Sequence, residues 1–140
     1  GEEINFQGEF VQWQNFMMRP KPAQPGGVPL VIGGISPSAI RRTVRYGDGW
    51  YVIGKDLDDY RLHLRALNEE CVRQGRNPRD LEITAYWNYH REGLERRAVY
   101  EELGVQRLLI NVHALRDRNI TNAMERFAND VVSKHGKEQH

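Results

Sequence analysis

The sequence of 140 residues has a single cysteine, Cys71, and no long apolar run. One cysteine can form neither an intrachain disulfide nor a cysteine-rich zinc site, so the composition fits a reducing compartment. A membrane-spanning helix needs about 18 consecutive apolar residues, and a charged-then-apolar leader is absent as well. With a mean hydropathy of −0.70, we expect a cytoplasmic protein with no membrane partner.

An excess of charge of one sign is also missing. The chain has 20 Lys+Arg and 19 Asp+Glu, a formal net charge of +1, and both signs are scattered along its length. Nucleic-acid-binding proteins concentrate basic residues in a stripe or patch. We therefore expect no nucleic-acid partner.

Motifs for metal binding and nucleophilic catalysis are lacking too. No two histidines have the HxxxH spacing and none is spaced with the cysteine as zinc ligands are, so we expect no metal site. There is no Gly-x-Ser-x-Gly elbow. His90 and His113 follow predicted strands, where a general acid or base can lie, but a plain loop role is commoner for each. The catalytic residues stay unassigned.

Residues 1–27 differ in character from the rest of the chain. Apolar and polar residues alternate over Glu3–Phe16, which predicts a β-hairpin. Residues 19–27 contain three prolines and two glycines, which predicts an irregular connector. The stretch before the connector is rich in large apolar side chains, namely Trp13, Phe16, Met17 and Met18. They can line a ligand pocket or pack against a partner, and packing in a core or an interface is the default expectation.

Residues 28–136 repeat a pattern of strand followed by helix, and residues 137–140 form a polar tail. The predicted strands are Val28–Ile32, Trp50–Ile53, Leu81–Trp87 and Val105–Val112. The predicted helices are Pro37–Tyr46, a long one between Asp56 and Gly75, Leu94–Leu103 stopped by Gly104, and one from about Thr121. Alternating strands and crossover helices predict the α/β class with a parallel sheet. Two architectures remain: an open doubly wound sheet, which the length favours, and four consecutive units of an eight-unit barrel.

Capping residues mark the predicted helix ends. Ser36 is the expected N-cap before Pro37, and Asp56 is the expected N-cap of the long helix. Gly47 is expected to end the first of these helices in the left-handed conformation, and Gly75 is expected to close the long one. The long helix has one apolar face, made of Leu57, Tyr60, Leu64, Leu67 and Cys71. The last helix has another, made of Met124, Phe127, Ala128, Val131 and Val132.

The candidate ligand site is the turn Gly33, Gly34, Ile35 and Ser36. It follows a buried strand and opens a helix, where free N–H groups and the helix dipole favour a phosphate. A tight turn that prefers glycine and a serine cap for its own geometry is an equally good interpretation. Neither a Walker loop nor a GxGxxG fingerprint is present. Ile53 and Gly54 end the next strand at the same edge, so a second loop can approach the same ligand.

Charged residues near these turns have plainer interpretations. Asp48 begins a strand at the opposite edge of the sheet, where a turn or packing role is expected. Arg41, Arg42 and Arg45 lie beyond the first turn of their helix. A solvated face or an ion-paired interface is expected for them rather than a phosphate site.

Several short segments, in this order and at these distances, resemble the luciferase-like monooxygenase family, in particular its deazaflavin-dependent oxidoreductases. The segments are Phe6–Phe10, Pro20–Pro22, Pro29–Gly34, Ala39–Arg42, Gly47–Trp50 and Gly75–Pro78. The resemblance extends over residues 4–112.

The resemblance implies a fold and a coenzyme. Members of that family are (β/α)8 TIM barrels that bind FMN or the deazaflavin coenzyme F420. The matching stretch resembles the carboxyl-terminal half of the barrel, four consecutive (β/α) units preceded by a β-hairpin. It implies that Gly33, Gly34, Ile35 and Ser36 hold the coenzyme phosphate, with Ile53 and Gly54 nearby. The first four strands of the barrel have no counterpart in these residues, so the resemblance supplies no catalytic base.

A half-barrel leaves two unpaired strand edges and one uncovered face. We therefore expect a homodimer, a higher homo-oligomer, or association with a separate amino-terminal half-barrel, with face-to-face sheet packing as a further alternative. The expected function is a part of an oxidoreductase or monooxygenase that is inactive alone. The alternative is a free-standing oligomeric binding or interaction protein without catalysis.

Overall fold

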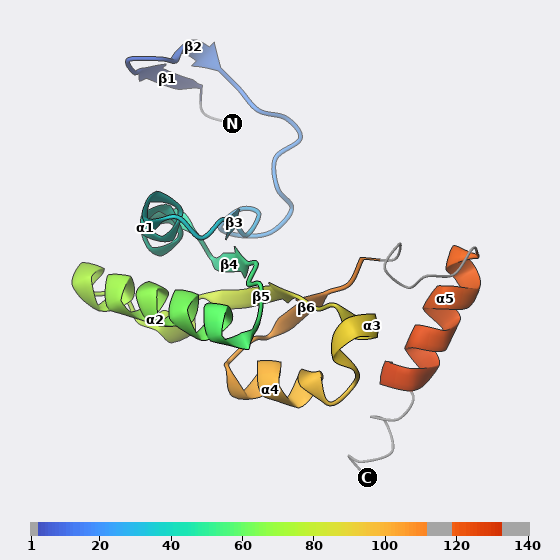
Figure 1. The fold of residues 1–140 in the computed structure, drawn as a ribbon. Coiled ribbons are helices and arrows are strands. Elements are labelled where there is room, and N and C mark those ends of the chain that lie inside the picture. The colour runs from blue at the N-terminus through green and yellow to red at the C-terminus, as the bar shows by residue number, and fades with distance from the viewer. Residues whose placement is uncertain (1–2, 112–118, 133–140) are drawn as a thin grey trace.

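The computed structural model describes residues 3–111 and 119–132, apart from the side chains of His90 and Val132 (Figure 1). It begins with the predicted hairpin, in which β1 (Ile4–Gln7) pairs antiparallel with β2 (Gln12–Phe16). An irregular connector then leads to a parallel four-stranded sheet, as the sequence predicts.

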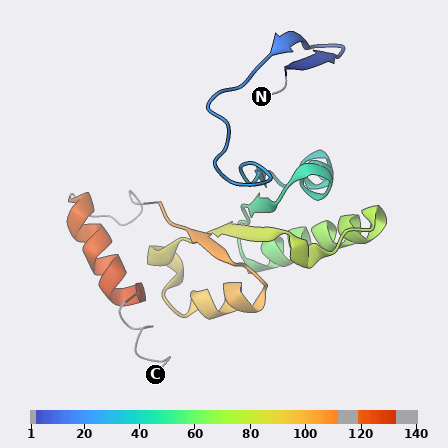
Figure 2. The ribbon, with the colours of Figure 1, turned by 180° about the vertical axis from the view of Figure 1, so that it is seen from behind.

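The hairpin lies apart from the sheet and its helices in both views (Figures 1 and 2). One of its faces is aromatic: the ring centroids of Phe6 and Trp13 are 5.9 Å apart, and those of Trp13 and Phe16 are 5.0 Å apart. Trp13 is 45% exposed and Met18 is 65% exposed. Packing of this stretch into the core is therefore wrong, and packing in an interface stays a prediction.

The sheet has the order β3-β4-β5-β6, with all neighbouring strands parallel. Its strands are β3 (Val31–Gly33), β4 (Gly49–Val52), β5 (Glu82–Tyr86) and β6 (Arg107–Leu109). Each lies within or overlaps its predicted range. β4 has the predicted length and is displaced by one residue, and the other three are shorter, because the backbone pairs with a neighbour over only part of each apolar run. Val112, the predicted end of the last strand, lies outside the described residues.

Helices follow the strands in the predicted alternation. They are α1 (Pro37–Tyr46), α2 (Leu57–Gln74), α3 (Tyr89–Glu92), α4 (Arg96–Glu102) and α5 (Ile120–Phe127), with a 3-10 turn at Pro78–Asp80 and a π-helical turn at Ala128–Val132. The bounds of α1 are those predicted. The short α3 is an addition, and α4 is shorter than expected.

The predicted caps are confirmed with one exception. Ser36 and Asp56 accept hydrogen bonds from the third amide of their helices, and Gly75 has a φ of 71°. Gly47, in contrast, is extended, with a φ of −85°. A Cβ there would lie 2.9 Å from the Thr43 carbonyl oxygen, so this position requires glycine for close backbone approach and not for a left-handed turn.

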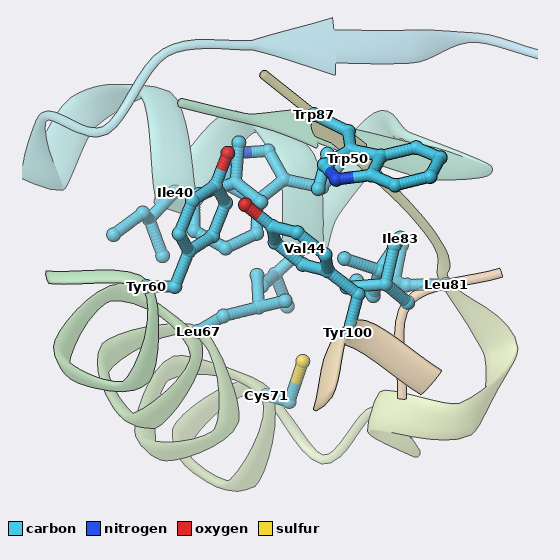
Figure 3. Packing of buried hydrophobic residues seen from close by; sticks show 13 residues of the cluster. Ile40, Val44, Trp50, Tyr60, Leu67, Cys71, Leu81, Ile83, Trp87 and Tyr100 are labelled. Atoms are coloured by element: carbon cyan, nitrogen blue, oxygen red, sulfur yellow. The ribbon is translucent and has the colours of Figure 1, made fainter. Parts of the chain in front are cut away.

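A single hydrophobic cluster joins the helices to one face of the sheet. Tyr60, Leu67 and Cys71 of α2 point into it (Figure 3), and Leu57 and Leu64 pack at its margin, as the predicted apolar face requires. The cluster also contains residues of α1, α4 and every second residue of β4 and β5, namely Ile40, Val44, Trp50, Val52, Ile83, Ala85 and Tyr100. Because these helices share one face, a doubly wound sheet does not fit the described chain.

The last helix departs from its prediction. Met124 is 53% exposed, and Ala123 is the buried residue of α5. Phe127 and Val131 do pack against the core. Trp87, Tyr89 and Phe127 form an edge-to-face group with centroid separations of 5.2–6.1 Å, and the Tyr89 hydroxyl donates to Asp130. These contacts rotate the helix so that Met124 faces outward. The polar tail, 137–140, lies outside the described residues.

The opposite face of the sheet carries no described helix. Val31, Ile53 and Leu109 are more than two-fifths exposed there or at its rim. Arg107 pairs with Glu82 across it at 2.9 Å. Among the residues the structure describes, no helix is long and apolar enough to cross a membrane.

Candidate functional site

The glycine turn, defined here as Gly33–Ser36, joins the carboxyl end of β3 to α1. All four of its residues are exposed. β3 and β4 are parallel neighbours, with Gly33 opposite Tyr51. The structure therefore brings the glycine turn and Ile53–Gly54 to the same edge of the sheet, as predicted.

The backbone of the turn requires glycine at position 34. Its φ is +108°, a value that residues with a side chain rarely adopt, and a Cβ there would lie 3.2 Å from the Cβ of Ala39. A Cβ on Gly33 would meet only a Tyr51 ring carbon, at 3.9 Å. The absent side chains leave the backbone of the turn open to a ligand.

Several amide donors of the turn are available to such a ligand. The Ser36 hydroxyl accepts from the Ala39 amide at 3.2 Å, and it lies 3.0 Å from the Ser38 hydroxyl. Pro37 has no amide hydrogen. Among the described residues, the amides of Ile35, Ser36 and Ser38 have no hydrogen-bond acceptor. They lie at the positive end of the α1 dipole, so the turn suits an anion.

Trp50, a core residue of β4, fixes the orientation of this turn from the buried side. Its indole Nε1–H donates to the Gly34 carbonyl oxygen at 2.8 Å, and Trp50 is 0% exposed. A carbonyl oxygen facing an anion would repel it, and this bond directs the Gly34 oxygen toward the core instead. Sequence reasoning did not single out Trp50. The available signal was that a buried indole N–H needs an acceptor.

The turn Ile53–Gly54, which follows β4, requires glycine for a packing reason. A Cβ on Gly54 would lie 2.5 Å from a ring carbon of Tyr60, so the missing side chain makes room for that ring. Ile53 is 53% exposed at the same edge. The Tyr60 hydroxyl donates to the Tyr86 carbonyl oxygen at 2.9 Å, which ties α2 to the end of β5.

Tyr60 and Tyr100 form a buried pair below the same edge. Their ring centroids are 5.4 Å apart in an edge-to-face arrangement, and the Tyr100 hydroxyl donates to Glu92 at 3.1 Å. Burial raises the pKa of both phenols, and the nearby Glu92 carboxylate raises the pKa of Tyr100 further. Both stay protonated near neutral pH and act as hydrogen-bond donors rather than bases.

Other candidates carry little chemistry. Asp48 accepts from the Leu30 amide at 2.8 Å at the opposite edge, a structural role as expected. Cys71 is buried, which raises the pKa of its thiol and makes it a poor nucleophile. No group of three potential metal ligands occurs within residues 3–111 and 119–132. His90 is in α3, and His113 lies outside the described residues.

The arginines of α1 are exposed, as expected for a solvated face. Among the described residues, neither Arg41, Arg42 nor Arg45 has a carboxylate within salt-bridge distance, and the alternative of an ion-paired interface stays a prediction. Together with Arg73 of α2 they line a hollow on the surface. Arg73 comes from a distant part of the sequence, so no local pattern indicated it.

Comparison with known proteins gives a family match over nearly the whole chain. The family model for luciferase-like monooxygenase proteins matches residues 1–137. An uncharacterized protein of Mycobacterium tuberculosis is 29% identical over 113 residues, which are 79% of this chain and 36% of the relative. The F420-dependent hydroxymycolic acid dehydrogenase of Mycobacterium tuberculosis is 31% identical over 81 residues, 58% of this chain and 22% of that protein. The chain thus spans about a third or less of the length of these relatives.

Solved structures give a partial match of the fold. An F420-dependent secondary alcohol dehydrogenase has a TM-score of 0.51 at 19% identity, covering 60% of this chain and 25% of that one. The coenzyme F420-dependent tetrahydromethanopterin reductase from Methanopyrus kandleri has a TM-score of 0.52 at 14% identity, covering 73% and 35%. At these identities the likeness concerns the fold alone.

Proposed function

The chain belongs to the luciferase-like monooxygenase family, and on that basis we propose that it is the carboxyl-terminal half-barrel of a flavin- or deazaflavin-dependent oxidoreductase. In this proposal it contributes the site for the coenzyme phosphate. The relative with a named activity is an F420-dependent dehydrogenase, which favours F420 as the coenzyme, and FMN is the alternative.

The glycine turn is the observation that carries this proposal. It offers free amides at Ile35, Ser36 and Ser38, two serine hydroxyls, and a backbone that no side chain covers. This donor set fits a phosphate, which accepts several hydrogen bonds at once and is favoured by the helix dipole. Ile53 and Gly54 would border the same ligand from the neighbouring strand.

The division of labour follows from the residues present. The coenzyme supplies the redox chemistry when bound, while the protein binds and orients it. The glycine turn would hold the phosphate, and the Trp50 indole would keep the Gly34 carbonyl away from it. No described residue is assigned as a catalytic acid or base, so turnover would require groups from outside these four (β/α) units.

Coenzyme binding tests the proposal directly. Purified chain is titrated into F420 and into FMN, and saturable changes in absorbance or fluorescence are measured. Gly34→Asp brings a carboxylate to the anion site and should abolish binding. Gly104→Asp is the matched control, because Gly104 also has a positive φ, +80°, and has open space around it before β6.

Two results would overturn the proposal. One is the absence of saturable binding of either coenzyme by the folded chain at high micromolar concentration. The other is binding that Gly34→Asp and Gly104→Asp weaken equally, since the glycine turn would then have no particular part in it.

We further propose that more parallel strands pair with the two open edges of the sheet and so enclose its helix-free face. These strands would come from a second copy of the chain or from a separate amino-terminal half-barrel. In the described chain β3 and β6 each have a strand on one side only. Val31 and Leu109, on those edge strands, are both 43% exposed. Unpaired edges and uncovered apolar side chains favour association.

Sedimentation at several concentrations tests the association. A homodimer or larger assembly that dissociates on dilution is expected for the chain alone. A compact monomer at every concentration would contradict self-association, and failure to bind a co-expressed amino-terminal half-barrel would contradict the remaining alternative.

A further inference from the structure

The sheet has two open edges that run in the same direction. Among the described residues, β3 and β6 each pair with a strand on one side only, and every strand pair is parallel. An edge strand presents unpaired N–H and C=O groups, which favour pairing with another strand. Because the two edges belong to different strands, β6 of one chain can pair in parallel with β3 of a second chain.

Exposed apolar side chains gather at both ends of the sheet. They are Leu30, Val31 and Ile35 at the β3 end, and Leu109 of β6 with Ile120 and Met124 of α5 at the β6 end. All six are more than two-fifths exposed. In both views α1 and α5 lie at opposite ends of the sheet (Figures 1 and 2). The two apolar groups therefore cannot cover each other within one chain, but each can cover the other group of a second copy.

The two edges also differ in the size of the side chains on the helix-free face. β3 contributes Val31 and Gly33 to this face, and β6 contributes Arg107 and Leu109. The space beside Gly33 is open, because a Cβ there would meet only a ring carbon of Tyr51, at 3.9 Å. The small residues of β3 thus leave room for the long side chains of β6 from a partner.

The charges on the helix-free face are balanced within one copy. Arg107 pairs with Glu82 at 2.9 Å, and these side chains are 55% and 39% exposed. Thr84, which is paired with Arg107 in the sheet register, is 3% exposed, and its hydroxyl has no hydrogen-bond partner among the described residues. Two such faces can be enclosed together without repulsion, since an enclosed charge needs a partner and each copy supplies its own.

We propose that two copies of the chain associate head to tail, with β6 of each beside β3 of the other, and close into an eight-stranded barrel. Both seams are then the same contact, so a two-fold axis along the barrel leaves no strand edge unpaired. Eight strands give a barrel whose interior side chains can fill. The Glu82–Arg107 pair of each copy lies inside. This inference rests on the association put forward under the proposed function, and it specifies the partner and the geometry.

Opposite charges introduced on the two edges test this geometry. Val31→Glu or Leu109→Lys alone places a charge in both seams of the dimer and should weaken it about tenfold or more. In a mixture of the two variants, a dimer with one chain of each has one unchanged seam, and its other seam brings the two opposite charges together. The mixture should therefore recover the affinity of the unmodified chain to within about threefold. Sedimentation equilibrium at several concentrations measures these affinities.

The matched controls introduce the same charges away from the edges. Val72 and Leu62 of α2 are 77% and 59% exposed. Val72→Glu and Leu62→Lys, alone or mixed, should leave the dissociation constant of the dimer within about twofold. Circular dichroism checks that all variants fold.

A second variant tests whether the ion pair is enclosed. Arg107→Met should leave the fold intact, because an exposed pair contributes little, but it should weaken the dimer about 100-fold, because Glu82 would be enclosed without a partner. Adding Glu82→Gln should recover most of that loss. Arg61→Met is the control: it breaks the exposed Arg61–Asp58 pair on α2, at 2.9 Å, and should leave the dimer unchanged.

The outcomes separate the possible failures. A dimer that the mixture does not restore would overturn head-to-tail closure and leave association in another geometry. A dimer that Arg107→Met and Arg61→Met affect equally would overturn the closed barrel. An unmodified chain that stays monomeric at every concentration would overturn this inference together with self-association, and an amino-terminal half-barrel would be the remaining partner. Coenzyme binding is decided separately by the titrations with F420 and FMN.

Discussion

Replacing Trp50 by phenylalanine isolates the hydrogen bond that orients the glycine turn. The change removes the indole N–H that donates to the Gly34 carbonyl at 2.8 Å and keeps an aromatic ring in the core. Trp87 provides a matched comparison. It is 1% exposed against 0% for Trp50, and its Nε1 has no acceptor among the described residues.

The expected difference follows from the two environments. Both substitutions lose a similar part of a buried ring, so the packing cost largely cancels between them. Trp50→Phe also loses a hydrogen bond with a net value of about 1 kcal/mol, whereas Trp87→Phe removes a buried donor whose lack of a partner costs about 1 kcal/mol or more. We expect Trp50→Phe to lower the free energy of unfolding by about 2 kcal/mol more than Trp87→Phe.

Urea denaturation followed by far-UV circular dichroism measures this difference without relying on tryptophan emission. The same proteins are then titrated with F420. Trp50→Phe should weaken coenzyme binding, because the Gly34 carbonyl is no longer held away from the anion, and Trp87→Phe should not. Equal losses of stability and equal affinities in the two variants would refute the positioning role of Trp50.

Three further substitutions test the packing around the site. Gly54→Ala should destabilise the fold by about 1–3 kcal/mol in urea denaturation, because its Cβ would lie 2.5 Å from the buried Tyr60 ring. Burial raises the pKa of the Tyr60 and Tyr100 phenols above 10.0, so the unfolded chain loses these protons first. Stability should therefore be complete below about pH 10 and fall above it by up to about 1.4 kcal/mol per pH unit for each phenol, and Tyr100→Phe should reduce that slope. Arg76→Met should cost about 1–2 kcal/mol in thermal unfolding, because Arg76 donates to the Val44 carbonyl at the end of α1, at 2.8 Å.

Each of these has a control in the same chain. Gly33→Ala, with its nearest contact at 3.9 Å, should change stability by less than about 0.5 kcal/mol. Tyr46→Phe alters a phenol on a residue that is 57% exposed and should leave the alkaline slope unchanged. Arg79→Met removes the same charge from an exposed side chain. If a control changes stability as much as its test variant does, the role inferred for the corresponding contact is contradicted.

Local sequence features determined most of the secondary structure. The bounds of α1 follow from Ser36, Pro37 and the apolar residues between them and Gly47, all within one short stretch. Asp56 and Gly75 define α2 in the same way. Capping and helical spacing act over a few residues, so they can be read without the fold. Gly47 shows that a correct residue can have a wrongly predicted reason: its need for glycine comes from the backbone oxygens of Thr43 and Gly49, within 3.1 Å, and not from its own φ.

In the candidate site, too, the local features were predictable from the sequence and the long-range contacts were not. The glycine turn was predictable as a strand-to-helix turn with a serine cap, because its residues are consecutive. Its support by Trp50, 16 residues away in sequence, and the meeting of Arg73 with the arginines of α1 were not. Periodicity shows that a side chain is buried or exposed, but not which distant atom it meets.

The sequence by itself thus determined the alternation of strands and helices, the hairpin and the position of the glycine turn. Only the tertiary structure decided that the helices of the core share one face of the sheet, that the aromatic hairpin lies away from that core, and that Arg73 meets the arginines of α1 in a surface hollow. The physical reason is range: propensities, caps and spacing act between near neighbours in the chain. The choice of face and of long-range partner depends on how the whole set of apolar surfaces is buried at once.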